Sequence, residues 1–135
     1  MADEDVPELK IAPEGQASGG GPWRMSFSVV NASTEAIELL EAWMPHVVLR
    51  AETQDLSATP PLPPGASVTL EFVVSYQPRA DATEPANPFM FLRVGWRGAE
   101  WRVLTQLALS HGTNGAPVVQ TVVIKAQRVG FSAGL

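Results

Sequence analysis

Alternation of apolar and polar side chains is the sequence feature that most restricts the fold of this chain. In residues 67–76 and 23–31, apolar side chains recur at every second position. The recurring residues are Val68, Leu70, Phe72 and Val74 in the first segment, and Trp23, Met25, Phe27 and Val29 in the second. Successive side chains of a strand point to opposite faces, so this period predicts strands with one buried face. Similar segments recur between Pro- and Gly-rich turns, which predicts an all-β domain of about eight short strands.

One segment, residues 34–44, fits two interpretations. Glu35, Glu38 and Glu41 recur at every third position, and the Ala, Leu, Glu and Met content favours a helix. Against a helix, the flanking segments are strand-like, and a turn at 31–34 joins this segment to the preceding strand. We therefore favour a strand, and a short helix over 34–44 remains the alternative.

The motifs "VVNAS", "IEL" and "LPPGASVTLEFVV", within residues 23–76, resemble the framework of bacterial immunoglobulin-like domains. In those domains an Asn-containing turn and a Leu-Pro-Pro-Gly loop bracket the middle strands. The resemblance implies an immunoglobulin-like antiparallel β-sandwich of about seven to eight strands, used for binding or assembly, with no substrate. We expect one domain over 9–128, an acidic flexible tail at 1–8 and an apolar C-terminal tail at 129–135.

Charge and hydropathy exclude several classes of function. The 135-residue chain has a net charge of −5, and residues 1–67 carry ten acidic side chains against three basic ones. Nucleic-acid binding needs clustered Lys and Arg, so we expect no nucleic-acid partner. No apolar run approaches the roughly 18 to 20 residues of a membrane-spanning helix, so we expect no membrane insertion. The acidic start "MADEDVPELK" lacks the pattern of a secretory signal, which predicts a cytoplasmic protein, with a mature exported form as the alternative.

Motifs with a chemical role are few. The chain has no cysteine, and neither His46 nor His111 has neighbours at a catalytic or ligand spacing. The Met-x-His spacing that ends at His46 is more often structural than a copper site. Residues 13–22, "PEGQASGGGP", predict a flexible loop, since no Lys-Ser/Thr follows the glycines as in a phosphate loop. We therefore predict a non-enzymatic protein with no catalytic residue, no cofactor and no metal site.

The stretch "RVGWRGAEWRVL" predicts a hairpin with Gly98-Ala99 as a two-residue type II′ loop. Counting outward pairs Trp96 with Trp101 at a non-hydrogen-bonded position and places an almost wholly apolar set on one face. That set is Met90, Leu92, Val94, Trp96, Trp101, Val103, Thr105 and Leu107. Arg97 and Arg102 fall on the other face. The prediction is that both tryptophans cap one end of the core, and the alternative is that they lie open and stack on a ligand.

Two features favour protein interaction. The strand expected at 117–128 has apolar side chains on both faces, as a central or covered strand does. The C-terminal tail ends in apolar residues that include Phe131. We predict an interaction or assembly module that uses an edge strand, the hairpin end and the tail, and that binds a protein partner or a second copy. Its candidate binding residues are Trp96, Arg97, Trp101, Arg102 and Phe131.

Two other functions remain open at this point. The first is a small-ligand, carbohydrate-type binding domain whose stacking surfaces are Trp96, Trp101 and Trp23. The second is a protease inhibitor that presents the Pro-rich loop 77–88.

Overall fold

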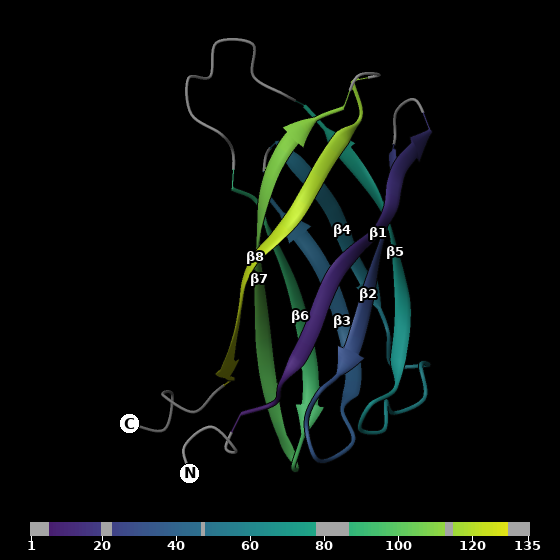
Figure 1. Cartoon of the computed structure of the whole chain (residues 1–135). Coiled ribbons are helices and arrows are strands. Elements are labelled where there is room, and N and C mark those ends of the chain that lie inside the picture. The colour runs from purple at the N-terminus through teal and green to yellow at the C-terminus, as the bar shows by residue number, and fades with distance from the viewer. Residues whose placement is uncertain (1–5, 20–22, 47, 78–86, 113–114, 130–135) are drawn as a thin grey trace.

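The computed structural model describes residues 6–19, 23–46, 48–77, 87–112 and 115–129. In these residues it has strands and no helix (Figure 1). The strands are β1 (Leu9–Gly19), β2 (Trp23–Asn31), β3 (Glu38–Pro45), β4 (Leu49–Asp55), β5 (Ser67–Tyr76), β6 (Phe89–Trp96), β7 (Ala99–His111) and β8 (Pro117–Arg128). All pairings are antiparallel, so the prediction of an all-β chain is confirmed.

The segment with two interpretations is a strand. Ile37 forms a bridge to Leu62, and β3 begins at the next residue. Leu40 breaks the alternation because it is the extra residue of a bulge, between the pairs Leu39–Val94 and Glu41–Arg93. Tertiary pairing on both sides of β3 thus overrides the helical preference of its residues, and the helix alternative over 34–44 is wrong.

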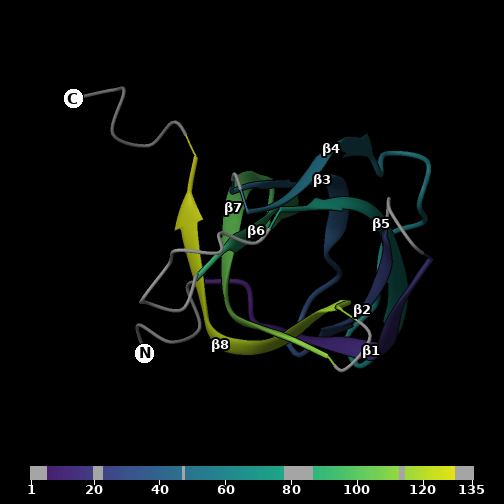
Figure 2. The same cartoon turned by 90° about the horizontal axis from the view of Figure 1, so that it is seen from above.

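The eight strands form one sheet in the order β1-β2-β5-β4-β3-β6-β7-β8. The sheet curves into a ring, which Figure 2 shows from above, so that the first and last strands approach each other. The antiparallel pairing between β4 and β5 is short and has the two residue pairs Leu49–Tyr76 and Arg50–Ser75. The expected immunoglobulin-like sandwich is therefore not confirmed: the strands pair as one nearly closed sheet.

The core fills the inside of this ring. The alternating residues of β2 and β5 face inward as predicted, and Phe27 packs edge-to-face on Phe72 with ring centroids 5.6 Å apart. The largest fully buried side chains are Phe27, Phe72, Ile37, Leu39, Met44, Leu49, Met90, Leu92, Leu107, Val29, Val74 and Val94. Apolar burial of this extent is the main stabilising contribution to the fold.

Strand β1 is longer than the sequence predicts. Residues 13–19, expected in a flexible loop, continue the strand and pair with β2, with an irregular stretch between Glu14 and Ser18. Gly15 has a φ of 67° within that stretch, a conformation that glycine adopts at little cost. The loop prediction for 13–19 is wrong, because pairing with β2 fixes a backbone whose composition alone is flexible.

The side chain of Asn31 organises the loops at one end of the ring. Its Nδ2 donates to the carbonyls of Glu35 (2.9 Å) and Leu62 (2.8 Å), and its Oδ1 accepts from the amide of Ser33 at 2.8 Å. Asn31 is fully buried. A buried amide with its hydrogen bonds satisfied is a structural element of the fold.

Candidate functional site

The hairpin turn of "GWRGAEW" lies one residue earlier than predicted. Trp96 pairs with Ala99, so Arg97 and Gly98 form the two-residue loop. Their φ values are 52° and 72°, the pair of positive angles that defines a type I′ turn. The predicted type II′ loop at Gly98-Ala99 and the direct pairing of Trp96 with Trp101 are therefore wrong. The type I′ turn matches the twist of the strands, but it holds the backbone of Arg97 in the left-handed conformation, which is unfavourable for a residue other than glycine.

The side chains still lie on the predicted faces of the hairpin, because the observed register differs from the predicted one by two residues, which is one full period of a strand. Trp96 and Trp101 are only 3% and 8% exposed, and their rings meet edge-to-face at 5.9 Å. They cap one end of the core, as the first interpretation predicts.

The arginines of the hairpin do not separate from the aromatic rings as predicted. The Arg97 guanidinium lies 4.4 Å from the Trp96 ring centroid, in cation–π geometry. The Arg102 guanidinium lies 5.8 Å from the ring of Phe91, on the outer surface of the sheet. Each arginine of the motif thus already contacts an aromatic ring of its own chain.

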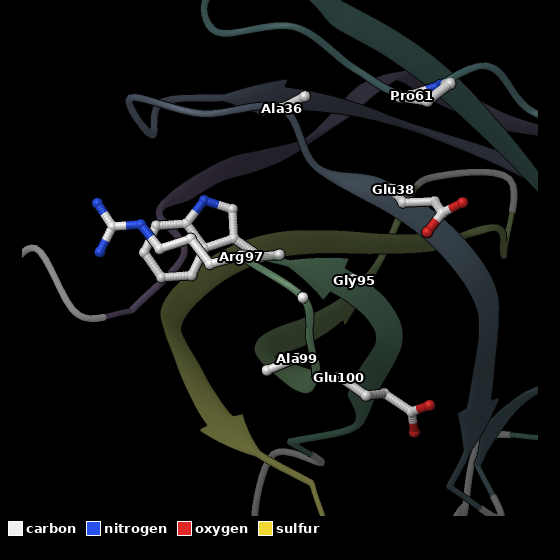
Figure 3. Close-up of a pocket in the computed structure, with 9 residues that line it drawn as sticks. Ala36, Glu38, Pro61, Gly95, Arg97, Ala99 and Glu100 are labelled. Carbon is white, nitrogen blue, oxygen red and sulfur yellow. The ribbon is translucent and has the colours of Figure 1, made fainter.

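An open cleft of about 510 Å³ lies beside the hairpin turn, lined by Ala36, Glu38, Pro61, Gly95, Trp96, Arg97, Gly98, Ala99 and Glu100. Figure 3 shows the carboxylates of Glu38 and Glu100 on one side of it, with the Arg97 guanidinium directed away from both. Arg97 is instead ion-paired with Glu35. No group of three or more His, Cys, Asp or Glu side chains in the described part of the chain lies close enough to hold a metal ion.

The neighbouring outer surface carries an ion-pair network centred on Arg93. Its Nε lies 2.9 Å from Glu41 and its Nη1 lies 2.8 Å from Glu100. The hydrogen bond that Arg93 donates to the Glu41 carboxylate is the main reason that the pKa of Arg93 is raised. The network ties β3, β6 and β7 together and is a structural feature.

Both indole N–H groups, Trp96 Nε1 and Trp101 Nε1, are buried and have no hydrogen-bond acceptor among the described residues. The hydroxyl of Thr105, which also faces inward, is likewise buried and has no hydrogen-bond partner among the described residues. Buried donors in native proteins are nearly always paired, with protein, water or a ligand. The three buried polar groups without partners in the described interior thus lie on the neighbouring strands β6 and β7.

The outward backbone of β8 forms a free edge of the sheet. Val129 donates its amide to Glu100, which identifies this pair as hydrogen-bonded in the β7–β8 ladder. Since bonded positions alternate, Lys125 and Gln127 face β7, and the N–H and C=O groups of Ile124 and Ala126 point away from it. Figure 2 shows the C-terminal half of β8 leaving the ring.

The opposing strand β1 is poorly suited to closing the ring. The Ala32 amide donates a hydrogen bond to the Glu8 carbonyl, which sets the same alternation of backbone groups in β1. The backbone groups of Leu9, Ile11 and Pro13 therefore point toward the seam between β1 and β8. Pro13 has no amide hydrogen to donate there, as is typical of protected edge strands. In place of a ladder, the hydroxyl of Thr121 donates to the Ile11 carbonyl at 2.8 Å.

A bulge explains why β8 is apolar on both faces. Gln106 pairs with Val123 and Leu107 with Thr121, so Val122 is an extra residue in β8. The inward-facing side chains are therefore at odd positions, such as Val119, before the bulge and at even positions, such as Ile124, after it. Val118 and Val122 lie outside, 40% and 58% exposed. A central position is wrong for this strand within the described residues, because β8 is the last strand in the sheet order. The other half of the prediction, that something covers the strand, stays a prediction.

The sequence interpretation missed an aromatic surface on the outside of the ring. Trp43 of β3 stacks on Phe91 of β6 with ring centroids 5.2 Å apart and planes 22° apart. Phe89 lies next along β6, 6.4 Å from Phe91. Positions 43, 89 and 91 are outward positions of β3 and β6, and this parity was the available signal. Since residues 34–44 fit both a helix and a strand by sequence, the sequence alone does not place Trp43 beside Phe91.

Other candidate residues are less informative. Phe131 and residues 78–86 of the loop 77–88 lie outside the described residues. Trp23 is partly buried against the core. The Nδ1 atom of His46 accepts a hydrogen bond from the Val48 amide at 3.1 Å, which gives this histidine a local structural role.

Comparisons with known proteins do not assign this chain to a family. None of the family models matches it, and no curated protein is significantly similar in sequence. A solved structure described as the X-ray structure of Northeast Structural Genomics Consortium target SoR45 is similar over 95% of this chain and 90% of that one. The sequence identity is 12% and the TM-score is 0.27. No helix in the described part of the chain is long and apolar enough to cross a membrane.

Proposed function

We propose that this protein is a non-enzymatic interaction module that binds an extended segment of another protein along the free edge of β8. The observation that carries the proposal is the outward backbone of Ile124 and Ala126, at the end of a sheet that fails to close. Such an edge accepts an added strand through main-chain hydrogen bonds, while side chains supply specificity.

Charge around the seam defines the segment that would fit. The chain's only lysines, Lys10 of β1 and Lys125 of β8, are exposed outward positions on the two strands that border the seam. An added strand would present every second side chain to this outer surface, between the two ammonium groups. Carboxylates at those positions would be attracted, so the proposed partner segment alternates acidic and apolar residues.

The remaining candidate residues have supporting roles in this proposal. Trp96 and Trp101, which are buried, would hold the hairpin end in place, and Arg97 and Arg102 would border the surface. The tail 129–135, which includes Phe131, would extend it. The immunoglobulin-like framework is not needed for this mode of binding and stays an expectation.

A matched pair of substitutions at one residue tests the proposal. Ala126→Pro removes an outward amide hydrogen and leaves the β7 ladder intact, whereas Ala126→Val keeps that hydrogen and has a similar side-chain volume. A display library of random peptides, selected on the wild-type protein, supplies the probe. We expect selected peptides to have alternating acidic residues, to bind Ala126→Val and to lose binding to Ala126→Pro. Selection of no peptide, or equal binding to both variants, would overturn the proposal.

The carbohydrate alternative is not favoured at the residues first considered for it. Trp96 and Trp101 have little exposed area for a sugar ring, and Arg97 lies against the Trp96 ring. The inhibitor alternative stays a prediction, since residues 78–86 of its loop are outside the described part of the chain.

A further inference from the structure

A second cleft lies on the outer surface, on the opposite side of the aromatic stack from β6. It has a volume of about 450 Å³ and is lined by Trp43, Met44, Pro45, Arg50, Ala51, Glu52 and Thr53. This volume is within the range of small-molecule sites, roughly 300 to 1,000 Å³. The cleft is separate from the seam between β1 and β8, because it is built by β3 and β4.

An irregularity in the sheet produces this cleft. Ala42 pairs with Gln54 and Met44 with Ala51, so Glu52 and Thr53 together oppose the single residue Trp43. This arrangement is a β-bulge on β4, which bends the strand and redirects side chains. Bulges are over-represented beside binding and active sites, and here the bulge brings a carboxylate and a hydroxyl next to an indole.

Trp43 is held as a rigid platform. Phe91 stacks on it with planes 22° apart, so one face of the indole is supported, and Trp43 also lines the cleft. Arg102 in turn lies over Phe91 at 5.8 Å. A ring fixed before binding loses little conformational entropy when a ligand stacks on it.

The polar side chains of the cleft are not engaged with one another. Among the described arginines, Arg50 alone has a side chain with no ion pair, hydrogen bond or ring contact. Glu52 and Thr53 are exposed and likewise have no side-chain partner in the described residues. A guanidinium, a carboxylate and a hydroxyl together supply both donors and acceptors beside an aromatic platform.

We propose that this cleft binds the ring of a carbohydrate. The apolar C–H face of a sugar would stack on Trp43, and its hydroxyl groups would exchange hydrogen bonds with Arg50 and Glu52. A sugar hydroxyl both donates and accepts, so it matches a guanidinium and a carboxylate side by side. A purely apolar ligand would leave both charged groups without partners.

The test is an array of mono- and oligosaccharides probed with the labelled full chain, followed by titration of the bound sugars. We expect saturable binding that weakens about tenfold or more in Trp43→Leu and is largely kept in Trp43→Phe, because phenylalanine retains the aromatic face. Arg50→Gln and Glu52→Gln should each weaken it severalfold. Binding by no sugar, or equal binding by Trp43→Leu with an unchanged unfolding midpoint, would overturn the proposal.

Matched controls separate this site from the seam. Lys125→Gln and Ala126→Pro should leave sugar binding unchanged, since β6 and β7 lie between β3 and β8. Sugar binding lost in those variants would contradict the assignment to the Trp43 cleft. Peptide binding at β8 should in turn be unaffected by Trp43→Leu, so each proposal fails on its own result.

Discussion

Proline substitutions at two adjacent residues of β8 should differ sharply in their effect on stability. The alternation of the β7–β8 ladder directs the Lys125 amide toward Leu104 and the Ala126 amide away from the sheet. Lys125→Pro therefore removes a ladder hydrogen bond, and Ala126→Pro removes none. The two positions are neighbours in the same strand and belong to the same β7–β8 ladder.

The size of the difference follows from the groups left unpaired. Loss of one backbone hydrogen bond lowers the free energy of unfolding by about 1 kcal/mol, and the unpaired carbonyl of Leu104 lowers it by roughly a further 1–3 kcal/mol. Lys125→Pro should thus lower the free energy of unfolding by about 2–4 kcal/mol. Ala126→Pro should change it by no more than about 1 kcal/mol, because proline is tolerated where the amide of an edge strand faces outward.

Urea unfolding followed by circular dichroism measures this difference. With a slope of about 1–3 kcal/mol per molar, the midpoint of Lys125→Pro should lie about 1–2 M below that of Ala126→Pro. Val123→Pro, which also faces β7, should behave like Lys125→Pro. Equal midpoints for the two adjacent variants, or a greater loss in Ala126→Pro, would refute the assignment of the free edge.

Further predictions concern the turns and the buried groups. Asn31→Ala should lower the free energy of unfolding by about 3 kcal/mol, since three backbone partners lose their bonds; a loss below about 1 kcal/mol in urea unfolding would contradict this. Gly98→Ala should lower it by about 1 kcal/mol through the positive φ alone, because nothing lies within 4 Å of the added Cβ; a D-alanine at this position should restore the loss. Variants that keep only Trp96 or Trp101 should show blue-shifted fluorescence that resists acrylamide, and red-shifted emission would show an open end of the core. Hydrogen bonds from Ser57 lower the pKa of the Asp55 carboxyl, so its contribution to stability is present above pH 3.8 and is lost as pH falls through the lowered pKa; Asp55→Asn should abolish this pH dependence, and equal acid sensitivity of both proteins would refute it.

Local sequence pattern was sufficient to predict the strands but not their arrangement. The alternation in β2 and β5 reports burial of one face, and that burial is found. Whether such strands form one curved sheet or two packed sheets depends on bulges, such as those at Leu40 and Val122. A bulge has no strong signature in a single sequence, because any residue type can be the extra one.

The hairpin shows the same limit at a smaller scale. The period of two fixed the faces of Trp96 and Trp101 correctly, but two registers that differ by two residues give identical faces. Glycine at the first loop position favours the predicted register, and the structure instead places Arg97 there with a φ of 52°. The candidate surfaces were predicted even less well, since the free edge of β8 and the stack of Trp43 on Phe91 both depend on strand order.

Hydrogen exchange at β8, with and without a selected peptide, tests the central claim most directly. In the free monomer, the amides of Ile124 and Ala126 should exchange quickly, while those of Val123 and Lys125, which face β7, are protected. Saturation with the peptide should slow exchange at Ile124 and Ala126 and leave the other two unchanged. Protection at all four amides in the free monomer, or no change at Ile124 and Ala126 on binding, would contradict strand addition at this edge.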